Sequence, residues 1–204
     1  MTHLQIIVAS PRRGAFGDRP ATWVQRYLDE HQDVRTEIVA LRDYPLPLFD
    51  QAPPAHTLRE YPSDEIARLG RMLDRADGFI IVTPEYNHGY PASVKNAMDH
   101  TFIEWRRKPV AFIGYGSVGG ARAIEQLRQV VIELEMAPLR HAVHILPDVM
   151  GSATSGNDPS DVSAFAPLQP KLATMIDDLL WWSIALAAHR DVEQRDVAQR
   201  RQAS

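Results

Sequence analysis

The chain has 204 residues, of which 45% are hydrophobic, and its 22 Lys and Arg against 26 Asp and Glu give a formal net charge of −4 at pH 7. This composition fits one globular domain of ordinary size and excludes a wholly disordered chain. Cysteine is absent, which excludes disulfides, thiolate nucleophiles and cysteine-ligated metals, so any redox activity must use a cofactor. The mild negative charge argues against a nucleic-acid or anionic-membrane partner.

Hydropathy gives no sign of a targeting or membrane segment. The first ten residues hold a short apolar run without a basic leader, and the longest apolar stretch, Leu179–Ala188, has ten residues. A membrane-spanning helix needs about 20. We therefore expect a cytoplasmic protein that does not associate with membranes.

Five apolar runs predict strands. The run Leu4–Ala9 is apolar almost throughout and ends at Ser10-Pro11, which predicts a strand buried on both faces. In Val34–Leu41 the even-numbered and odd-numbered residues would point to opposite faces of a strand, and polar residues such as Arg35 and Glu37 share one of these faces. This pattern predicts a strand nearer the edge of a sheet. The remaining predicted strands are Gly78–Thr83, Pro109–Tyr115 and Leu139–Leu146.

Five segments with helical periodicity follow these runs. Asp18 is the expected N-terminal cap of the first, with Pro20 in its first turn. The predicted helices are Asp18–His31, Ser63–Arg75, Pro91–Glu104, Gly119–Glu135 and Lys171–His189, and a continuation of the last one into the polar tail is the alternative to its end at His189. Two proline-rich segments, Arg42–Tyr61 with Pro53 and Pro54 among its prolines and Pro147–Pro170, interrupt the alternation, and we expect both to be long loops.

Strands that alternate with helices pair in parallel through right-handed crossovers. The order of elements therefore predicts an α/β fold of three layers, with a five-stranded parallel sheet and helices on both faces. We expect a single domain over residues 1–190 and a polar, solvated tail over residues 191–204.

Glycines gather where the first, third and fourth predicted strands end. Open α/β sheets bind ligands at this edge, and glycine there allows a close backbone approach or a positive φ. These glycines lie in three loops. The last of the three in chain order, Gly114–Gly120, predicts only a flexible turn when it is taken alone. The glycines concerned are Gly14, Gly17, Gly89, Gly114, Gly116, Gly119 and Gly120.

The first loop, Ser10–Asp18, joins a buried strand to a helix N-terminus, which is a favourable place for an anion. The Ser10 hydroxyl, the Arg12 guanidinium and the N–H groups of Gly14 and Gly17 suit a phosphate monoester. The loop has neither the Gly-Lys-Ser/Thr of a P-loop nor a G-x-G-x-x-G turn. An ordinary turn with solvent-facing arginines remains the alternative.

The second loop, Thr83–Asn96, combines polar and aromatic residues between a strand and a helix. Such a turn can present backbone groups to a flat heterocycle, with Tyr86 as a wall. A turn rich in Asn, Gly and Pro for conformational reasons alone is the alternative. Conformation alone does not explain why the same segment also carries Glu85, Tyr86, Lys95 and Asn96.

Several stretches resemble the NADPH-dependent FMN reductase family, which includes flavin, quinone, azo-dye and chromate reductases. The run TPEYNHGYPASVKNAMDH, Thr83–His100, is the most specific, and Glu104–Ala123 and Arg42–Asp50 also fit. Ala9–Val24 resembles the phosphate loop of the family, which usually begins Gly-Ser-x-Arg, with Ala9 in place of the glycine. The resemblance covers about residues 4–145.

The resemblance implies a flavodoxin-like fold with sheet order 2-1-3-4-5 and a non-covalently bound FMN. By position, it implies that Ser10, Arg12, Phe16 and Gly17 hold the FMN phosphate, that Pro84, Glu85, Tyr86 and Asn87 line the flavin ring, and that Gly116, Ser117 and Gly119 close its other side. It also implies a homodimer or homotetramer with the site at the subunit interface.

The resemblance further implies that FMN carries hydride from NADPH or NADH to a small acceptor by a ping-pong mechanism. The acceptor is a quinone, a free flavin, an azo compound or a metal oxyanion. Arg12, Arg13 and a net charge of only −4 argue against the alternative, a flavodoxin-type carrier serving a protein partner. The three glycine loops argue against a flavin-free interaction domain. We expect no catalytic acid–base residue and no metal, because the eight histidines form no metal-binding motif.

The stretch Leu179–Ala188 has more apolar surface than one face of a helix needs, because it contains Trp181, Trp182 and Ile184. This pattern predicts that the helix contacts both the domain core and a second subunit. A helix wholly buried within one subunit is the alternative.

Overall fold

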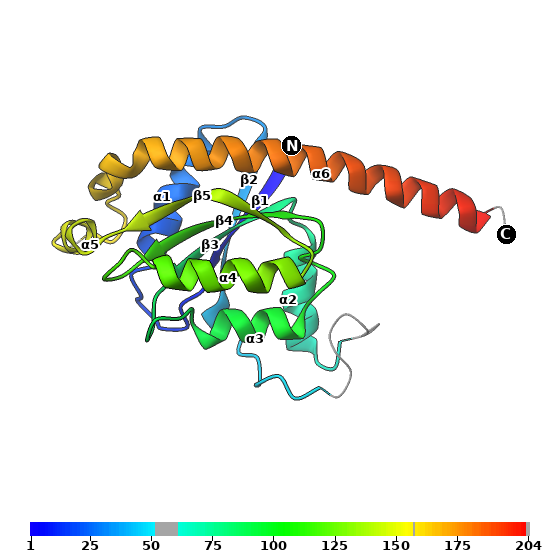
Figure 1. Ribbon diagram of the computed structural model, residues 1–204, viewed down its shortest axis with the longest axis horizontal. Helices are drawn as coiled ribbons and strands as arrows, with labels where there is room; N and C mark the ends of the chain where they lie inside the picture. The colour runs from blue at the N-terminus through cyan, green and yellow to red at the C-terminus, as the bar shows by residue number, and fades with distance from the viewer. Residues whose placement is uncertain (52–60, 157, 203–204) are drawn as a thin grey trace.

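The computed structural model describes residues 1–51, 61–156 and 158–202 (Figure 1). Its five strands form one sheet in the order β2-β1-β3-β4-β5, with all neighbouring strands parallel. The strands are β1 Thr2–Val8, β2 Val34–Ala40, β3 Gly78–Pro84, β4 Pro109–Tyr115 and β5 Ala137–Ile145. The predicted fold class and strand order are confirmed, and β2 is the edge strand that its alternating pattern predicted.

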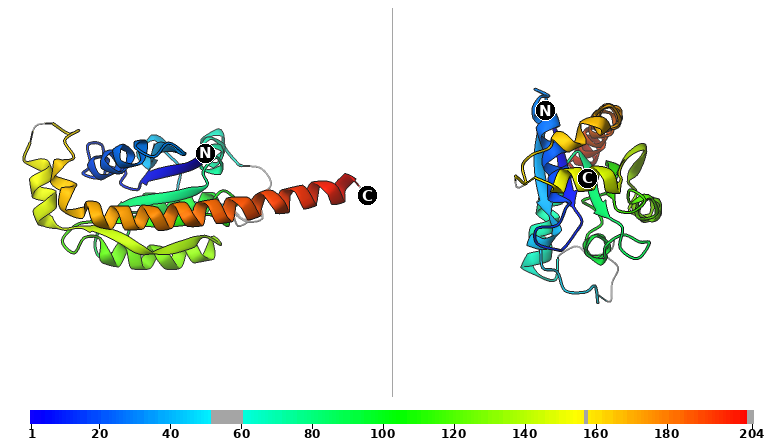
Figure 2. Two further views of the ribbon diagram at one scale, coloured as in Figure 1. Left: turned by 90° about the horizontal axis from the view of Figure 1, so that it is seen from above. Right: turned by 90° about the vertical axis from the view of Figure 1, so that its left-hand side faces the viewer.

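Helices cover both faces of this sheet (Figures 1 and 2). They are α1 Asp18–Asp29, α2 Asp64–Asp74, α3 Ala92–His100, α4 Ala121–Glu133, α5 Pro147–Thr154 and α6 Gln169–Gln202. The core on one face is shared by the sheet with α1 and α6, and the core on the other face is shared with α2, α3 and α4.

Strands β1, β3 and β4 are apolar on both sides because both of their faces are covered. Along β1, Ile6 packs in the layer with α1 and α6, whereas Ile7 packs in the layer with α2, α3 and α4. Each such fully buried side chain contributes about 1.5–3 kcal/mol to the free energy of unfolding. A continuous apolar run is therefore the pattern of a central strand here.

Two helix starts differ in their capping. At α2 the predicted start is confirmed, because the Ile66 N–H donates to the Ser63 hydroxyl at 3.3 Å. At α1 the prediction that Asp18 is the cap is wrong, because Gly17 occupies the N-cap position. The Asp18 carboxylate instead accepts a hydrogen bond from Arg42 Nη1 at 2.8 Å.

Two predicted element boundaries are also corrected. The third helix ends at His100 rather than Glu104, because Thr101 has an extended backbone with φ −131° and ψ 143°. The fifth strand begins at Ala137, whose backbone N–H donates to the Lys108 carbonyl at 3.0 Å where the pairing with β4 starts.

The prediction of a structureless loop over Pro147–Pro170 is wrong in its described part. This segment forms α5 and a 3₁₀ helix, Ser163–Leu168, and its first proline occupies the first turn of α5, where no N–H is needed. Phe165 anchors the segment, because its buried ring stacks on Trp23 with centroids 5.0 Å apart. In the other proline-rich connection, Pro53 and Pro54 lie outside the described residues.

Helix α6 continues past residue 190, where we expected the domain to end, and reaches Gln202 beyond the body of the domain (Figures 1 and 2). Its core face is buried around Leu179. On its outer side Trp181, Trp182 and Ile184 are 64%, 40% and 59% exposed, so the alternative of a helix wholly buried within one subunit is wrong. Among the described helices, none combines the length and the hydrophobicity needed to cross a membrane.

Candidate functional site

The loops after β1, β3 and β4 meet at one edge of the sheet, because parallel pairing puts the ends of these strands side by side. Val8 pairs with Val82, and Pro84 pairs with Tyr115. A side-chain contact joins the first two loops, since the hydroxyls of Ser10 and Tyr86 lie 3.0 Å apart. The predicted site residues of all three loops are therefore brought to one place.

The first loop combines a buried hydroxyl with open backbone. Ser10 is fully buried, and the Arg12 N–H approaches its hydroxyl at 3.4 Å. The Arg12 side chain is exposed. Gly14 has φ +65°, and a Cβ at this position would meet no atom within 4 Å. The loop thus offers a free guanidinium and an uncrowded backbone at the N-terminus of α1, which suits an anion.

The side chain of Phe16 is half-buried and packs against the core. Its ring packs against Tyr115 with centroids 5.1 Å apart and against Phe165 at 6.2 Å. Its backbone amide therefore remains as the group that can bind a ligand. Gly17 needs to be glycine for packing, because a Cβ there would lie 3.0 Å from the Tyr115 hydroxyl.

The second loop is a tight two-residue hairpin turn. The N–H of Tyr86 donates to the Gly89 carbonyl at 2.9 Å, and the Gly89 N–H donates to the Tyr86 carbonyl at 3.0 Å. Asn87 and His88 between them have φ of 49° and 68°, as a type I′ turn requires. This turn projects Asn87 into solvent, whereas Pro84 stays buried at the end of β3.

Glu85 does not project into open space. Its side chain is only 5% exposed, and it accepts hydrogen bonds from Arg122 Nε at 2.5 Å and from the Arg122 backbone N–H at 3.1 Å. Burial acts to raise the pKa of the Glu85 carboxyl, but the hydrogen bonds and charge of Arg122 outweigh it, so the pKa lies below its usual value. Our sequence reasoning missed Arg122, although its place two residues after Gly120, where the neighbouring helix begins, was a usable signal.

The third loop uses positive φ at three glycines: Gly116 at +138°, Gly119 at +64° and Gly120 at +69°. The Gly119 N–H donates to the Gly116 carbonyl at 2.9 Å, which closes a turn around exposed Ser117. A Cβ at Gly120 would lie 2.7 Å from the Cα of Gly114. The glycines therefore allow α4 to begin directly against β4.

Lys95 and Asn96, which we associated with the second loop, have structural partners outside the site. Asn96 accepts a hydrogen bond from the Phe49 N–H at 2.9 Å and donates to the Pro47 carbonyl at 2.7 Å. Lys95 pairs with Asp99 at 2.5 Å. Both residues thus stabilise α3 and the connection after β2, and Asn96 also lines a hollow beside Pro11 of the first loop.

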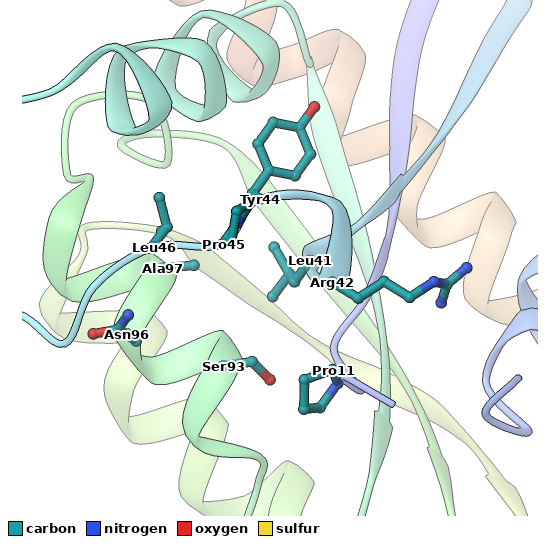
Figure 3. A pocket seen from close by; sticks show the side chains of 9 residues that line it. All are labelled: Pro11, Leu41, Arg42, Tyr44, Pro45, Leu46, Ser93, Asn96 and Ala97. Atoms are coloured by element: carbon teal, nitrogen blue, oxygen red, sulfur yellow. The ribbon is translucent and has the colours of Figure 1, made fainter. Parts of the chain in front are cut away.

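Hollows lie on both sides of the first loop. One of about 210 Å³ lies between Pro11, the segment Leu41–Leu46 and the start of α3, where Leu41, Ser93 and Ala97 line it (Figure 3). Another of about 480 Å³ adjoins Gly14, Phe16 and the loop after α5. The first loop therefore stands between two cavities.

The Tyr115 hydroxyl supplies a test of whether a phosphorylated cofactor fits here. Tyr115 is 5% exposed, and in the described part of the chain no group meets its hydroxyl at hydrogen-bonding geometry. Buried hydroxyls normally have a partner. An unpaired donor next to Gly17, together with the open backbone at Gly14 and the exposed Arg12, fits the phosphate of FMN. The sequence signal for Tyr115 was a polar group at the end of an otherwise apolar strand.

Comparisons with known proteins agree with this geometry. The family model described as NADPH-dependent FMN reductase matches residues 2–148. An NAD(P)H-dependent FMN reductase of Schizosaccharomyces pombe is 34% identical over 146 residues, which cover 70% of this chain and 73% of that protein. A 2-hydroxy-1,4-benzoquinone reductase of a Burkholderia species is 39% identical over 101 residues, which cover 45% and 51% of the two chains.

A solved structure has the same fold. The flavoenzyme NAD(P)H:(acceptor) oxidoreductase FerB of Paracoccus denitrificans superposes with a TM-score of 0.72, at 21% identity, over 91% of this chain and 98% of that chain. Three findings point to the same family: the sheet order, the three converging loops and the match of the family model over residues 2–148. The chain belongs to the NADPH-dependent FMN reductase family.

Proposed function

We propose that this oxidoreductase uses bound FMN to pass hydride from NADPH or NADH to a small-molecule acceptor. The observation that carries the proposal is the convergence of the three loops, with the hydroxyls of Ser10 and Tyr86 3.0 Å apart where the first two loops meet. The family to which the chain belongs supports it.

Each loop has a separate task in this proposal. The first loop holds the phosphate, the second lines the flavin ring and the third closes its other side. The residues in these roles are Ser10, Arg12, Phe16 and Gly17, then Pro84, Glu85, Tyr86 and Asn87, and finally Gly116, Ser117 and Gly119. Phe16 and Gly17 act through their backbone amides, and Glu85 acts by holding the second and third loops together through Arg122.

When bound, FMN supplies the two-electron chemistry that the side chains of this chain lack. The protein would bind the cofactor and orient it. Arg12 supplies positive charge to the phosphate end, and the contact between Ser10 and Tyr86 fixes the second loop against the first. No protein group needs to move a proton in this scheme.

The acceptor proposed is a quinone, a free flavin, an azo compound or a metal oxyanion. The Burkholderia relative is named as a benzoquinone reductase, which favours the quinone. Donor and acceptor would share the one pocket that the three loops leave for the flavin, so they would occupy it in turn, and we expect ping-pong kinetics.

We also propose that the protein works as a homodimer or homotetramer in the cytoplasm. Trp181, Trp182 and Ile184 form an exposed apolar surface on α6, and a second copy of the chain is its proposed occupant.

Steady-state turnover tests the function. NADPH and NADH are each varied at several fixed concentrations of a benzoquinone, with free FMN and an azo dye as further acceptors. Parallel lines in double-reciprocal plots, and activity that disappears when flavin is removed, are expected. Activity in flavin-free protein, or intersecting lines, would overturn the mechanism.

A further inference from the structure

We propose that the hydroxyl of Tyr115, at the end of β4, is a phosphate donor of the FMN site. This inference rests on the proposed function and adds a residue from the third strand end to the phosphate-binding group. In this proposal the phosphate is bound by groups at the end of β1, at the start of α1 and at the end of β4, rather than by the first loop alone.

The first observation is that this hydroxyl is buried without a partner. Tyr115 is 95% covered by the protein, and its oxygen is one of five buried side-chain atoms without a hydrogen bond among the described residues. Leaving a buried hydroxyl unpaired is unfavourable. A donor kept at that cost beside a ligand loop is explained if the ligand pairs with it.

The second observation is where the oxygen lies. A Cβ built on Gly17, the N-cap of α1, would be 3.0 Å from the Tyr115 hydroxyl and 3.3 Å from a Val8 methyl. The Ser10 hydroxyl and the Gly17 amide are near enough to act to lower its pKa, although neither reaches hydrogen-bonding geometry. The oxygen is thus next to the amide that begins α1, where anions bind.

The third observation concerns the chemistry of the group. Burial, aided by nearby Tyr86, raises the pKa of Tyr115 above its ordinary value of 10.0. The hydroxyl therefore stays protonated at any pH at which the enzyme would work. A neutral O–H that donates to an anionic oxygen forms a short, strong hydrogen bond. A deprotonated tyrosine would repel the phosphate instead.

The ring of Tyr115 is held in place by its neighbours. Phe16 packs on it at 5.1 Å, and Phe16 in turn contacts Phe165, whose ring stacks on Trp23. Because the ring is already held, little of its side-chain freedom remains to be lost on binding.

Substitution Tyr115→Phe tests the inference, because it removes the oxygen and keeps the ring. Dissociation constants for FMN and for riboflavin, which lacks the phosphate, are measured by fluorescence titration of the flavin-free protein. We expect FMN binding to weaken at least about tenfold, and riboflavin binding to change less than about twofold. Tyr27→Phe, which removes a half-buried hydroxyl elsewhere on α1, is the matched control and leaves both constants unchanged.

Urea unfolding of the flavin-free variants separates binding from a structural role. Because the hydroxyl has no partner to lose, Tyr115→Phe should be as stable as the wild type or more stable. A destabilised or unfolded variant would show a structural role and overturn the inference. Equal losses for FMN and riboflavin, or no loss for either, would overturn it as well. Failure of the wild type to bind FMN would instead refute the proposed function.

Discussion

Glu85 and Arg122 join the loop after β3 to the first turn of α4. The carboxylate accepts hydrogen bonds from both the guanidinium and the backbone N–H of Arg122. It also lies at the N-terminus of a helix, where negative charge is favourable. Because the proposed site puts the two loops on opposite sides of the flavin ring, we propose that this pair sets the gap between them.

Substitution Glu85→Gln should weaken this connection. Glu85 is almost fully buried while Arg122 is 41% exposed, so solvent screens part of the loss, and we expect the free energy of unfolding to fall by about 1–3 kcal/mol. Urea denaturation measures the change in the free energy of unfolding. Glu125→Gln, which alters an exposed carboxylate on α4, the helix of Arg122, is the control. If both variants are as stable as the wild type, the pair does not hold the loops.

The same pair gives a pH dependence. The pKa of the Glu85 carboxyl is lower in the folded protein than its ordinary value of 4.5, so the contribution of the pair is fully present above pH 4.5. It is lost as the pH falls through the lower, folded-state pKa. The stability difference between the wild type and Glu85→Gln should therefore shrink in acid, and a difference that grows there would contradict the assignment.

Substitution Arg12→Ala should weaken FMN binding tenfold or more, because it removes a charge-assisted contact of about 1.5–3 kcal/mol with the phosphate. Fluorescence titration measures the constant. Arg13→Ala, the exposed neighbour, provides the control. Unchanged affinity in Arg12→Ala would remove Arg12 from the site.

Substitution Gly116→Leu should lower FMN occupancy. Gly116 has φ +138°, which L side chains rarely adopt, and a side chain there would enter the space assigned to the ring. The flavin content of the purified protein, read from its absorbance, reports the effect. Gly151→Ala is the control, since that position has no positive φ and no neighbouring atom within 4 Å of a Cβ. Full occupancy in Gly116→Leu would place the ring elsewhere.

The double variant Trp181→Ser/Trp182→Ser should disrupt assembly, because it removes the two largest apolar side chains from the exposed side of α6. Light scattering should give a multiple of 23.0 kDa for the wild type and a smaller mass for the variant. Ile103→Ser, at an exposed apolar residue of the turn after α3, is the control. A wild-type monomer at micromolar concentration would refute the oligomer.

Lys108 gives a prediction at alkaline pH. Burial lowers its pKa from 10.5 to about 8, so between these values the unfolded chain binds the proton that the folded chain has released. The free energy of unfolding of the wild type should therefore rise between pH 8 and pH 10 relative to Lys108→Met, by up to about 3 kcal/mol. Parallel pH profiles of the two proteins in urea denaturation would show that Lys108 is charged when folded.

The strands and their order could be predicted because central strands covered on both faces are continuously apolar, as β1 and β3 are. The 3₁₀ helix around Phe165 could not, because its stability comes from stacking on Trp23, about 140 residues away in the sequence. Local composition showed only the prolines of that segment.

The sequence could predict which loops carry the site residues, but not where their side chains point. Glycine positions and the strand ends placed Ser10, Tyr86 and Gly116 at one edge. Sequence could not show that Glu85 turns toward Arg122, or that Phe16 packs against Tyr115, because both depend on partners from other elements of the fold.

Reduction of the reconstituted protein by NADPH tests the central claim most directly. The protein is loaded with FMN and mixed with NADPH without oxygen and without acceptor in a stopped-flow instrument, with flavin absorbance as the readout. We predict that the flavin absorbance bleaches fully and returns when a benzoquinone is added in a second mix. A protein that binds no FMN, or whose flavin stays oxidised until NADPH and quinone are present together, would contradict the account.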